Sequence, residues 1–211
     1  MAQITHGLRA ILSASAAYDF FQNLVGAGRF RRTIVSEHLV VAPSSRILDI
    51  GCGTAEILRY LPDDVEYHGF DVSEAYIRTA RDRFGRRGSF VTQLLTDADL
   101  AQLPRFDLVL AIGLVHHLSD AEADRLFAIA ARALAPGGRL FTIDPCLMPG
   151  QNILARAVIR RDRGQNVRSL EGYRKLAEPH FSRVEAGVRS DLLRIPYTHA
   201  LLTCSSPGRN Q

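Results

Sequence analysis

Cysteine is scarce in this sequence. The 211 residues include three cysteines, and these are widely spaced, at Cys52, Cys146 and Cys204. An odd number at such spacing excludes a disulfide framework and a CxxC metal clip. The histidines show no spacing typical of a zinc triad either. We therefore expect neither a disulfide scaffold nor a bound metal ion.

Long apolar runs are also missing. A membrane-spanning helix needs roughly 18 or more consecutive apolar residues. The longest candidate, residues 11–27, is interrupted by Asp19, Gln22 and Asn23. The start of the chain is a poor signal peptide, because Arg9 is the only Lys or Arg before a short stretch rich in Ser and Ala. We expect a cytoplasmic protein with no membrane span.

Lysine is almost absent. Lys175 is the only lysine, and arginine occupies every other Lys-or-Arg position. Arginine in place of lysine more often reflects the base composition of a genome than a nucleic-acid surface. The net charge of +4 and the pI near 9.2 are therefore not taken as a sign of nucleic-acid binding. No aromatic residues interleave with the basic ones, as a single-strand platform requires, so we expect no nucleic-acid partner. One local excess of arginine is either a solvated helix face or a site for an anionic substrate. It comprises Arg156, Arg160, Arg161, Arg163 and Arg168, against Asp162.

The first 42 residues have the pattern of helices. Apolar side chains from Tyr18 to Val25 form one helical stripe, and Gly26 and Gly28 interrupt it. A second helix follows. Because 211 residues are typical of one domain, we expect residues 1–42 to be a helical N-terminal lid on a single domain.

After residue 43, short apolar runs alternate with helical segments. The clearest helix opens at Ser119, whose spacing to Glu122 is that of a capping box, and it stops at Pro136-Gly137-Gly138. The last two runs are joined too closely for a crossover, so we expect them to form an antiparallel hairpin. The alternation predicts an α/β fold with a doubly wound, mostly parallel seven-stranded sheet. The predicted strands are residues 46–51, 65–71, 90–95, 106–112, 139–143, 181–189 and 197–204.

The first predicted strand ends in a glycine-rich turn, Asp49-Ile-Gly-Cys-Gly-Thr-Ala55. Two glycines spaced by one allow a tight turn and a close approach of the backbone to a ligand. The helix after them would point its free amides at that ligand. Asp71 ends the next strand, 18 residues after Gly53, where a carboxylate accepts ribose hydroxyls. Together these features predict a nucleoside-containing cofactor, either NAD or S-adenosylmethionine.

Three features separate these cofactors and favour S-adenosylmethionine. Glu56 occupies the position at which the dinucleotide fingerprint has its third glycine. Asp49 precedes the glycines by two residues, where a carboxylate can meet an ammonium group. Asp97 follows the third predicted strand, where it either receives the exocyclic amine of adenine or caps a short helix.

The chain resembles the class I S-adenosylmethionine-dependent methyltransferases over about residues 43–145. The likeness is specific as an ordered set of motifs, and Ala55 stands where the loop of this family usually has a third glycine. The motifs are Ile47-Leu-Asp-Ile-Gly-Cys-Gly-Thr-Ala55, Gly69-Phe-Asp-Val-Ser73, Thr96-Asp-Ala98, Phe106-Asp-Leu-Val109, Val115-His-His-Leu118 and Leu134-Ala-Pro-Gly-Gly138.

This resemblance implies S-adenosylmethionine as the cofactor and also implies which residues hold it. Gly51 and Gly53 would lie against the methionine part, and Asp71 would take the ribose. Val72 would pack on adenine, and Asp97 would bind its amine. The full set of expected cofactor residues is Asp49, Gly51, Cys52, Gly53, Asp71, Val72, Asp97, Ala98 and Ile112.

Two adjacent histidines follow the fourth predicted strand, next to the expected methyl group. Methyl transfer requires the protein to align the acceptor, exclude water and, where needed, remove a proton. Imidazole titrates near neutral pH, so we expect His116 to be a general base, with pocket lining as the alternative. We expect His117 to line the substrate site or to be structural. The other expected substrate contacts are Tyr18, Tyr173 and Arg194.

The expected organisation places a cofactor-binding core at residues 43–145, a substrate lid at 146–180 and the hairpin at 181–205. We expect transfer of a methyl group to a small, polar or anionic acceptor. An RNA or protein methyltransferase and a catalytically silent S-adenosylmethionine-binding scaffold are the alternatives, and a nicotinamide oxidoreductase ranks after them. The Asn/Asp-Pro-Pro-aromatic loop of DNA amino-methylating enzymes is absent, and Cys146 reads as a small buried residue. The acceptor, the atom methylated and the oligomeric state stay open.

Overall fold

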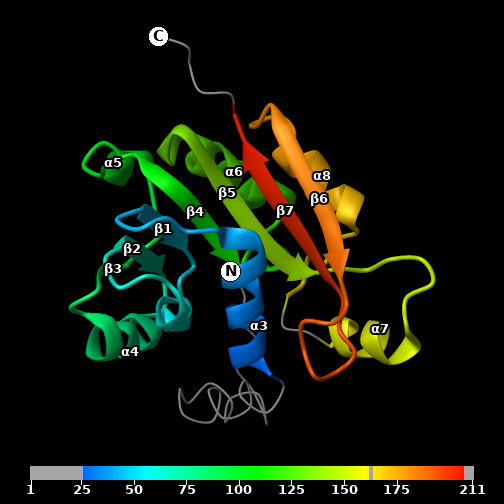
Figure 1. The fold of residues 1–211 in the computed structure, drawn as a ribbon. Coiled ribbons are helices and arrows are strands. Elements are labelled where there is room, and N and C mark those ends of the chain that lie inside the picture. Colours follow the sequence, from blue (N-terminus) through cyan, green and yellow to red (C-terminus); the bar gives the residue numbers. More distant parts are fainter. Residues whose placement is uncertain (1–25, 162–163, 207–211) are drawn as a thin grey trace.

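A single seven-stranded sheet organises the chain (Figure 1). The computed structural model describes residues 26–161 and 164–206. The strands lie in the order β3-β2-β1-β4-β5-β7-β6, and the first five run parallel while β7 is antiparallel to both of its neighbours. Their bounds are β1 Arg46–Ile50, β2 Glu66–Asp71, β3 Gly88–Thr92, β4 Phe106–Ile112, β5 Leu134–Pro145, β6 Arg183–Arg189 and β7 His199–Ser205.

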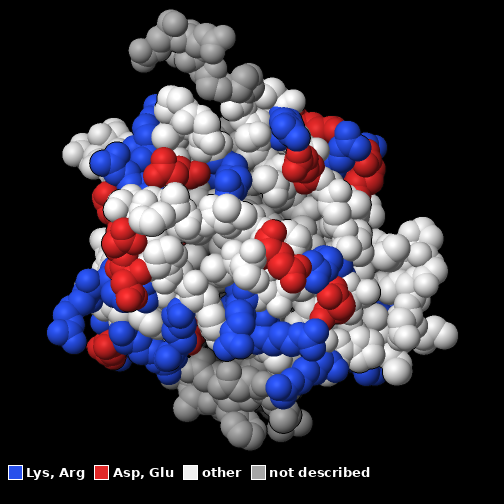
Figure 2. Space-filling model, in the orientation of Figure 1, with Lys and Arg blue, Asp and Glu red and all other residues white. Residues whose placement is uncertain are grey.

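The helical segments connect the strands and cover both faces of the sheet. Basic side chains gather over α3 on the face shown in Figure 2, because this helix contributes three arginines within AGRFRRTI. The longer segments are α3 Ala27–Ile34, α4 Glu74–Phe84, α6 Asp120–Ala133, α7 Ile153–Arg160 and α8 Leu170–Ala177. The short ones are η1 Val35–Leu39, η2 Glu56–Tyr60, α5 Asp97–Leu100 and η3 Val115–His117.

Two apolar layers enclose the sheet. On one face, Ile34 and Leu39 pack with Ile77 of α4 in a cluster that includes Ile47 of β1. On the other face, Phe127 of α6 packs in a second cluster with residues of α8, β4 and β5. Helices on both faces bury the central strands, which explains their near-continuous apolar sequences.

The predicted fold class is confirmed, including the antiparallel end of the sheet. The strand order reverses between β1 and β4, which are hydrogen-bonded neighbours with the next strand in sequence on the far side of each. Ligands of such sheets lie at the carboxyl ends of the strands near this reversal. The loops after β1, β2 and β4 begin at that edge, so the glycine turn, Asp71 and the two histidines are brought to one end of the molecule.

The capping box of α6 also forms as predicted, because Ser119 accepts from the amide of Glu122 while its own amide donates to the Glu122 carboxylate at 2.9 Å. Two details differ. The segment after the glycine turn is only the 3-10 turn η2, since Ala55 takes a left-handed φ of 55° before it and Pro62 follows closely. The break predicted at both Gly26 and Gly28 occurs at Gly26 alone, whose φ is 94°.

Strand ends shift as well. β3 spans Gly88–Thr92 rather than residues 90–95, and β5 begins at Leu134, five residues before its predicted start. The early start follows from a register shift in β4. Phe106 pairs with Leu134 and Leu108 pairs with Arg139, so the Pro-Gly-Gly turn is a bulge within β5. The predicted helical stripe from Tyr18 to Val25 lies outside the described residues.

Candidate functional site

The glycine turn after β1 folds back over the end of β2. The amides of Gly51 and Cys52 both donate to the carbonyl oxygen of Phe70, at 2.7 and 3.1 Å. Gly51 and Gly53 have φ angles of 74° and 55°, which L-residues with side chains rarely adopt. A Cβ on Gly51 would lie 3.0 Å from the side chain of Leu114. The turn is therefore in contact with the loop after β4.

Asp71 at the end of β2 holds this turn in place. One carboxylate oxygen accepts from the Gly53 amide at 3.0 Å, and the other accepts from the Ser73 amide at 2.8 Å. Burial raises the pKa of Asp71, and the two amide donors act in the opposite direction. Each oxygen keeps a second lone pair, so the carboxylate can still accept ribose hydroxyls. Val72 follows Asp71 directly and has 49% of its surface exposed.

Asp49 is a buried carboxyl group at the same edge, with 3% of its surface exposed. One oxygen accepts a hydrogen bond from the Tyr67 hydroxyl, and the other has no hydrogen-bond partner among the described residues. Burial raises the pKa of Asp49 to about 7, and the negative charge of Asp71 adds to the rise, while the Tyr67 hydrogen bond opposes it. A buried carboxyl with a vacant oxygen fits an ammonium group, because such a partner restores the charged form.

Of the remaining expected cofactor residues, Cys52 and Ile112 pack in the same apolar cluster beside this turn, whereas Asp97 and Ala98 of α5 lie toward the start of β4. Cys52 is half-buried, its Sγ lies 3.7 Å from the Gly53 carbonyl oxygen, and burial raises the pKa of its thiol. Ile112 ends β4 and is half-buried. Asp97 and Ala98 are exposed at the start of α5.

Asp97 pairs with Arg132 of α6. The alternative that Asp97 caps the short helix is wrong, since Thr96 is the N-cap residue and Asp99 returns the reciprocal hydrogen bond. The Asp97 carboxylate is therefore not occupied by a helix cap. Arg132 is in the last turn of α6, next to the start of β5, so this pair holds Asp97 at the amino edge of the sheet, away from the glycine turn.

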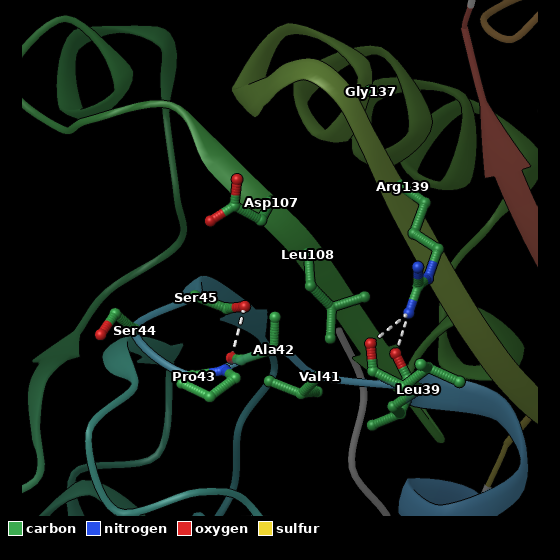
Figure 3. A pocket seen from close by; sticks show the side chains of 11 residues that line it. Leu39, Val41, Ala42, Pro43, Ser44, Ser45, Asp107, Leu108, Gly137 and Arg139 are labelled. Carbon is green, nitrogen blue, oxygen red and sulfur yellow. Dashed lines mark hydrogen bonds between the residues drawn. The ribbon is translucent and has the colours of Figure 1, made fainter.

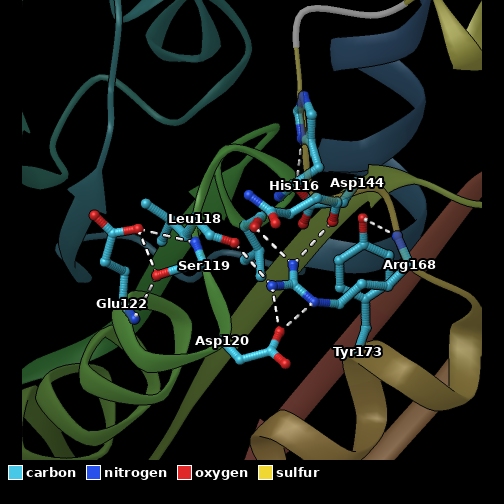
Figure 4. A network of polar contacts seen from close by, with 10 residues as sticks. His116, Leu118, Ser119, Asp120, Glu122, Asp144, Arg168 and Tyr173 are labelled. Atoms are coloured by element: carbon cyan, nitrogen blue, oxygen red, sulfur yellow. Dashed lines mark hydrogen bonds and ion pairs between the residues drawn. The ribbon is translucent and has the colours of Figure 1, made fainter. Parts of the chain in front are cut away.

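His116 forms a buried pair with Asp144 at the end of β5 (Figure 4). His116 Nδ1 lies 2.8 Å from Asp144 Oδ1, and the His116 amide donates to the same oxygen at 3.1 Å. The exposed fractions are 5% and 2%. A carboxylate at Nδ1 favours the tautomer with the proton on Nδ1, which leaves Nε2 as the basic nitrogen. Sequence reasoning missed Asp144 as a site residue, although its position directly after a buried strand could have indicated it.

The segment from Gly164 to Arg168 crosses over this histidine. A Cβ on Gly164 would overlap the His116 ring and lie 2.8 Å from the His116 carbonyl oxygen. The same carbonyl accepts from the amide of Asn166 at 3.0 Å. The segment is therefore in direct contact with the candidate base and covers part of its ring.

Arg168 secures that crossing (Figure 4). Its guanidinium donates to the carbonyl oxygens of Val115 and Leu118 at 3.1 and 2.8 Å, and it pairs with Asp120 at 2.7 Å. Only 13% of its side chain is exposed. Neither interpretation of the arginine excess applies to Arg168, because its half-buried guanidinium is taken up by the backbone carbonyls of the histidine loop and by Asp120.

The expected substrate residues are only partly brought to the site. His117 is exposed, and its ring lies 4.0 Å from that of His116, centroid to centroid. Arg194 is exposed and packs against Gly26 at the start of α3. Tyr173 is 1% exposed, and its hydroxyl donates to the Pro145 carbonyl at 2.9 Å. This position suits a core residue and not a substrate contact.

Tyr18 lies outside the described residues. Within residues 26–161 and 164–206, no group of three or more His, Cys, Asp or Glu side chains is arranged to hold a metal ion. No described helix is long and apolar enough to cross a membrane.

Two cavities lie at opposite edges of the sheet. One, of about 360 Å³, is lined by Leu39 to Ser45 with Asp107 and Arg139, at the amino ends of the strands (Figure 3). Its polar groups serve the fold, because Arg139 donates to the backbone of Leu39 and Val40. The other, of about 430 Å³, lies at the carboxyl edge between α7 and the loop joining β6 to β7. It is lined by Met148, Gly150, Gln151, Asn152, Ala155, Val188, Ser190, Pro196, Tyr197 and Thr198.

Comparison with known proteins identifies the domain that carries this edge. Residues 48–140 match a family described as a methyltransferase domain. The chain is 31% identical over 157 residues to the ubiquinone/menaquinone biosynthesis C-methyltransferase of Ectopseudomonas mendocina, covering 68% of this chain and 59% of the relative. It is 35% identical over 117 residues to the 27-O-demethylrifamycin SV methyltransferase of Amycolatopsis mediterranei, covering 53% and 42%. The chain thus spans about half the length of these curated relatives.

Among solved structures, the fold is similar to that of phosphoethanolamine N-methyltransferase 2 of Haemonchus contortus, with a TM-score of 0.71 at 16% identity. That alignment covers 95% of this chain and 59% of the other. The sheet order, the glycine turn and the family match together define a class I methyltransferase fold. Residues 48–140 thus match a methyltransferase domain, and the similar Haemonchus contortus enzyme was solved in complex with S-adenosylhomocysteine.

Proposed function

We propose that this protein transfers the methyl group of S-adenosylmethionine to a small, polar or anionic acceptor, with His116 as general base. The observation that carries the proposal is the buried His116–Asp144 pair, at 2.8 Å, on a loop that packs against the glycine turn through Leu114. This arrangement supports His116 as the base, because its imidazole is held by a carboxylate on a loop that contacts the expected cofactor turn.

The residues at the carboxyl edge fit the cofactor. The vacant buried oxygen of Asp49 suits its ammonium group. A Cβ on Gly53 would meet nothing within 4 Å, so the turn leaves open space for the methionine part. Asp71 would hold the ribose, and Val72 would pack on the adenine. When bound, the cofactor supplies an electrophilic methyl group on a sulfonium sulfur.

The chain itself supplies orientation and proton transfer. Asp144 would keep the Nδ1 proton of His116 in place, so that Nε2 accepts the proton of the methyl acceptor as its nucleophilic atom attacks. The carboxylate then lies beside the imidazolium that forms and stabilises its charge. Gly164 and Arg168 hold the histidine loop and help to exclude water from the ring. Asp144 is therefore proposed as a positioning residue, because it acts through His116.

The cavity beside α7 is the proposed acceptor site. It lies at the same edge as His116, and Gln151 and Thr198 give it polar walls. The Oε1 atom of Gln151 is buried with no hydrogen-bond partner among the described residues, so an acceptor with a donor group could satisfy it. Arg194 lies exposed in the neighbouring loop and suits an anionic group. The two curated relatives are named as a C-methyltransferase of ubiquinone/menaquinone biosynthesis and as a 27-O-demethylrifamycin SV methyltransferase, which supports a small-molecule acceptor.

The test is a turnover screen that detects S-adenosylhomocysteine as the product. Full-length protein is incubated with S-adenosylmethionine and fractionated small-molecule pools, and S-adenosylmethionine and NAD binding are measured separately by calorimetry. We expect binding of S-adenosylmethionine but not of NAD, and turnover with at least one pool. Binding of S-adenosylmethionine without turnover on any small-molecule, RNA or protein pool would instead favour a catalytically silent scaffold.

A further inference from the structure

Helix α7 presents a second apolar face to the exterior. Ala155 and Ile159 are 3% and 1% exposed and anchor the helix on the protein. Ile153, Leu154 and Val158 are 84%, 64% and 37% exposed. An ordinary surface helix has one apolar face, which it buries, so the exposed apolar face of α7 requires a separate explanation.

These exposed side chains form one continuous stripe. At about 100° per residue, Ile153, Leu154 and Val158 lie within an arc of about 140° around the helix, and the half-buried Ala157 lies between Ile153 and Leu154. The buried pair lies beyond one border of the arc. Arg156 and Arg160 lie beyond the other border, and neither forms an ion pair with any described residue.

The charge around this stripe has one sign. No Asp or Glu occurs from residue 145 to residue 161, whereas this segment contains Arg156, Arg160 and Arg161. The next acidic residue, Asp162, is outside the described residues. Figure 1 shows α7 at the periphery, on a long connection that leaves the sheet after β5. An apolar stripe with a basic border, carried away from the core, is typical of a helix that lies in a membrane interface.

We propose that α7 docks the protein on the surface of an anionic lipid bilayer. Ile153, Leu154 and Val158 would enter the boundary between headgroups and acyl chains, while Arg156 and Arg160 would contact lipid phosphates. A second copy of this chain fits less well, because a two-fold contact through this face brings the same arginines of both copies together. This surface stands independently of the proposed methyl transfer.

Docking would also orient the carboxyl-edge cavity. Ala155 projects from the buried side of α7 into the lining of that cavity, and Met148, which is 41% exposed, lines it from the preceding loop. Helix α7 would thus lie between the cavity and the lipid bilayer. The mouth of the cavity would then lie close to the lipid headgroups.

The absence of tryptophan from the chain permits a direct test. The variant Leu154→Trp places a single fluorophore on the stripe, and Leu94→Trp places one at a site of matched exposure, 63%, near α5. Each variant is titrated with vesicles of phosphatidylcholine alone and of phosphatidylcholine with phosphatidylglycerol. We expect a blue shift for Leu154→Trp on the anionic vesicles, quenched by brominated acyl chains, and no shift for Leu94→Trp.

Sedimentation with the same vesicles measures the contribution of each part of the surface. Ile153→Ser with Leu154→Ser should lower binding by roughly tenfold or more. Arg156→Gln with Arg160→Gln should lower it by about fivefold for each arginine removed. Arg86→Gln with Arg125→Gln removes the same charge from exposed sites on other helices or loops and should have a much smaller effect.

Three results would overturn the proposal. The first is the absence of vesicle binding by the unaltered protein. The second is a blue shift of Leu154→Trp that rises with protein concentration and needs no lipid, because a second copy would then cover the stripe. The third is a blue-shifted signal at every concentration without lipid, because residues 1–25 of the same chain would then be the occupant.

Discussion

Two buried carboxyl groups lie at the carboxyl edge of the sheet, and they differ in what they face. Asp49 in β1 and Asp144 in β5 are 3% and 2% exposed, and each has one oxygen without a hydrogen-bond partner among the described residues. Asp49 faces the neutral hydroxyl of Tyr67, whereas Asp144 faces the ring of His116. A buried carboxylate is stable only beside a cation or several donors, so the partner decides the role.

The comparison separates binding from catalysis. Asp49 has no basic partner among the described residues, which fits a carboxyl group that binds the ammonium group of a ligand. Asp144 has a titratable partner in the protein, which fits a group that positions a base. Substitution of Asp49 should therefore change affinity for the cofactor, and substitution of Asp144 should change turnover.

The largest effect is expected for the base itself. His116→Gln should lower kcat by at least about 100-fold, because proton removal by a positioned base contributes on that order, while the affinity for S-adenosylmethionine stays near that of the unaltered protein. Single-turnover kinetics and calorimetry measure the two quantities. His180→Gln, at a half-buried histidine that is paired with Asp124 away from the candidate site, is the matched control. Retention of turnover and of the pH profile by His116→Gln would reduce the residue to pocket lining.

The next largest effect is expected for Asp144→Asn, which preserves shape but removes the charge. We expect kcat to fall roughly 10- to 100-fold, because the imidazolium loses its stabilising neighbour. The acidic limb of the pH–rate profile should also move to lower pH, a change that a purely structural role would not produce. The double variant with His116→Gln should lose little beyond the single His116 variant, because the two residues act as one unit. Additive losses would show that they act separately.

Asp49→Asn should act on affinity instead. We expect S-adenosylmethionine to bind about 10- to 100-fold more weakly, since a charge-assisted hydrogen bond contributes roughly 1.5–3 kcal/mol. In the unaltered protein, affinity should fall as the pH drops through about 7, because Asp49 has a pKa of about 7 and its protonated form lacks the charge. Calorimetry between pH 5.5 and 8.5 measures both effects. 5′-Methylthioadenosine, which lacks the ammonium group, should bind both proteins equally, and a pH dependence that survives in Asp49→Asn would contradict the assignment.

The cofactor half of the site was largely predictable from the sequence, for a local reason. The glycine turn and Asp71 each follow a strand that ends nearby in sequence, so spacing alone places them at one edge, whereas Asp97 lies five residues beyond β3 and pairs with the end of α6. The acceptor half depends on contacts between distant segments. Asp144 contacts His116 because Ile112 of β4 pairs with Ile143 of β5. The register between two strands cannot be read from the sequence of either strand alone, so this contact could not be predicted.

The interpretations that failed did so because burial depends on tertiary packing. Tyr173 was an expected substrate contact, but α8 packs its ring into the core beside β5 and β7. Arg168 belongs to a basic stretch in the sequence, but it folds inward onto backbone carbonyls of the histidine loop. Tyr67 sits in an ordinary apolar strand, and only the sheet brings its hydroxyl to Asp49.

A smaller effect is expected on the stability of the unliganded protein. Asp49 has a pKa of about 7 when folded against an ordinary value of 3.8, so the folded state binds its proton more tightly than the unfolded state. Its contribution to stability is therefore present at low pH and is lost as the pH rises from about 4 to about 7, by at most about 1.4 kcal/mol per pH unit. Urea unfolding of the unaltered protein and of Asp49→Asn should show this slope only in the former. Saturating S-adenosylmethionine should reduce the slope, and identical slopes without ligand would place the titration on another group.

The smallest and most specific effect is expected for Tyr67→Phe. Burial holds the pKa of Tyr67 well above its usual value, so the hydroxyl remains a donor to Asp49 throughout the physiological range. This hydrogen bond favours the carboxylate and opposes the effect of burial. Its removal should therefore raise the pKa of Asp49 further and move the midpoint of the pH-dependent S-adenosylmethionine affinity upward, by up to about one pH unit. Above that midpoint the affinity should return to within a few-fold of normal, because the charge at Asp49 is retained.

The variant Tyr76→Phe, on helix α4, is the control for loss of a tyrosine hydroxyl elsewhere. If the midpoint of the pH-dependent affinity does not move in Tyr67→Phe, Tyr67 only fills space. If the affinity for S-adenosylmethionine falls at every pH, Tyr67 shapes the site by packing and not through the charge of Asp49.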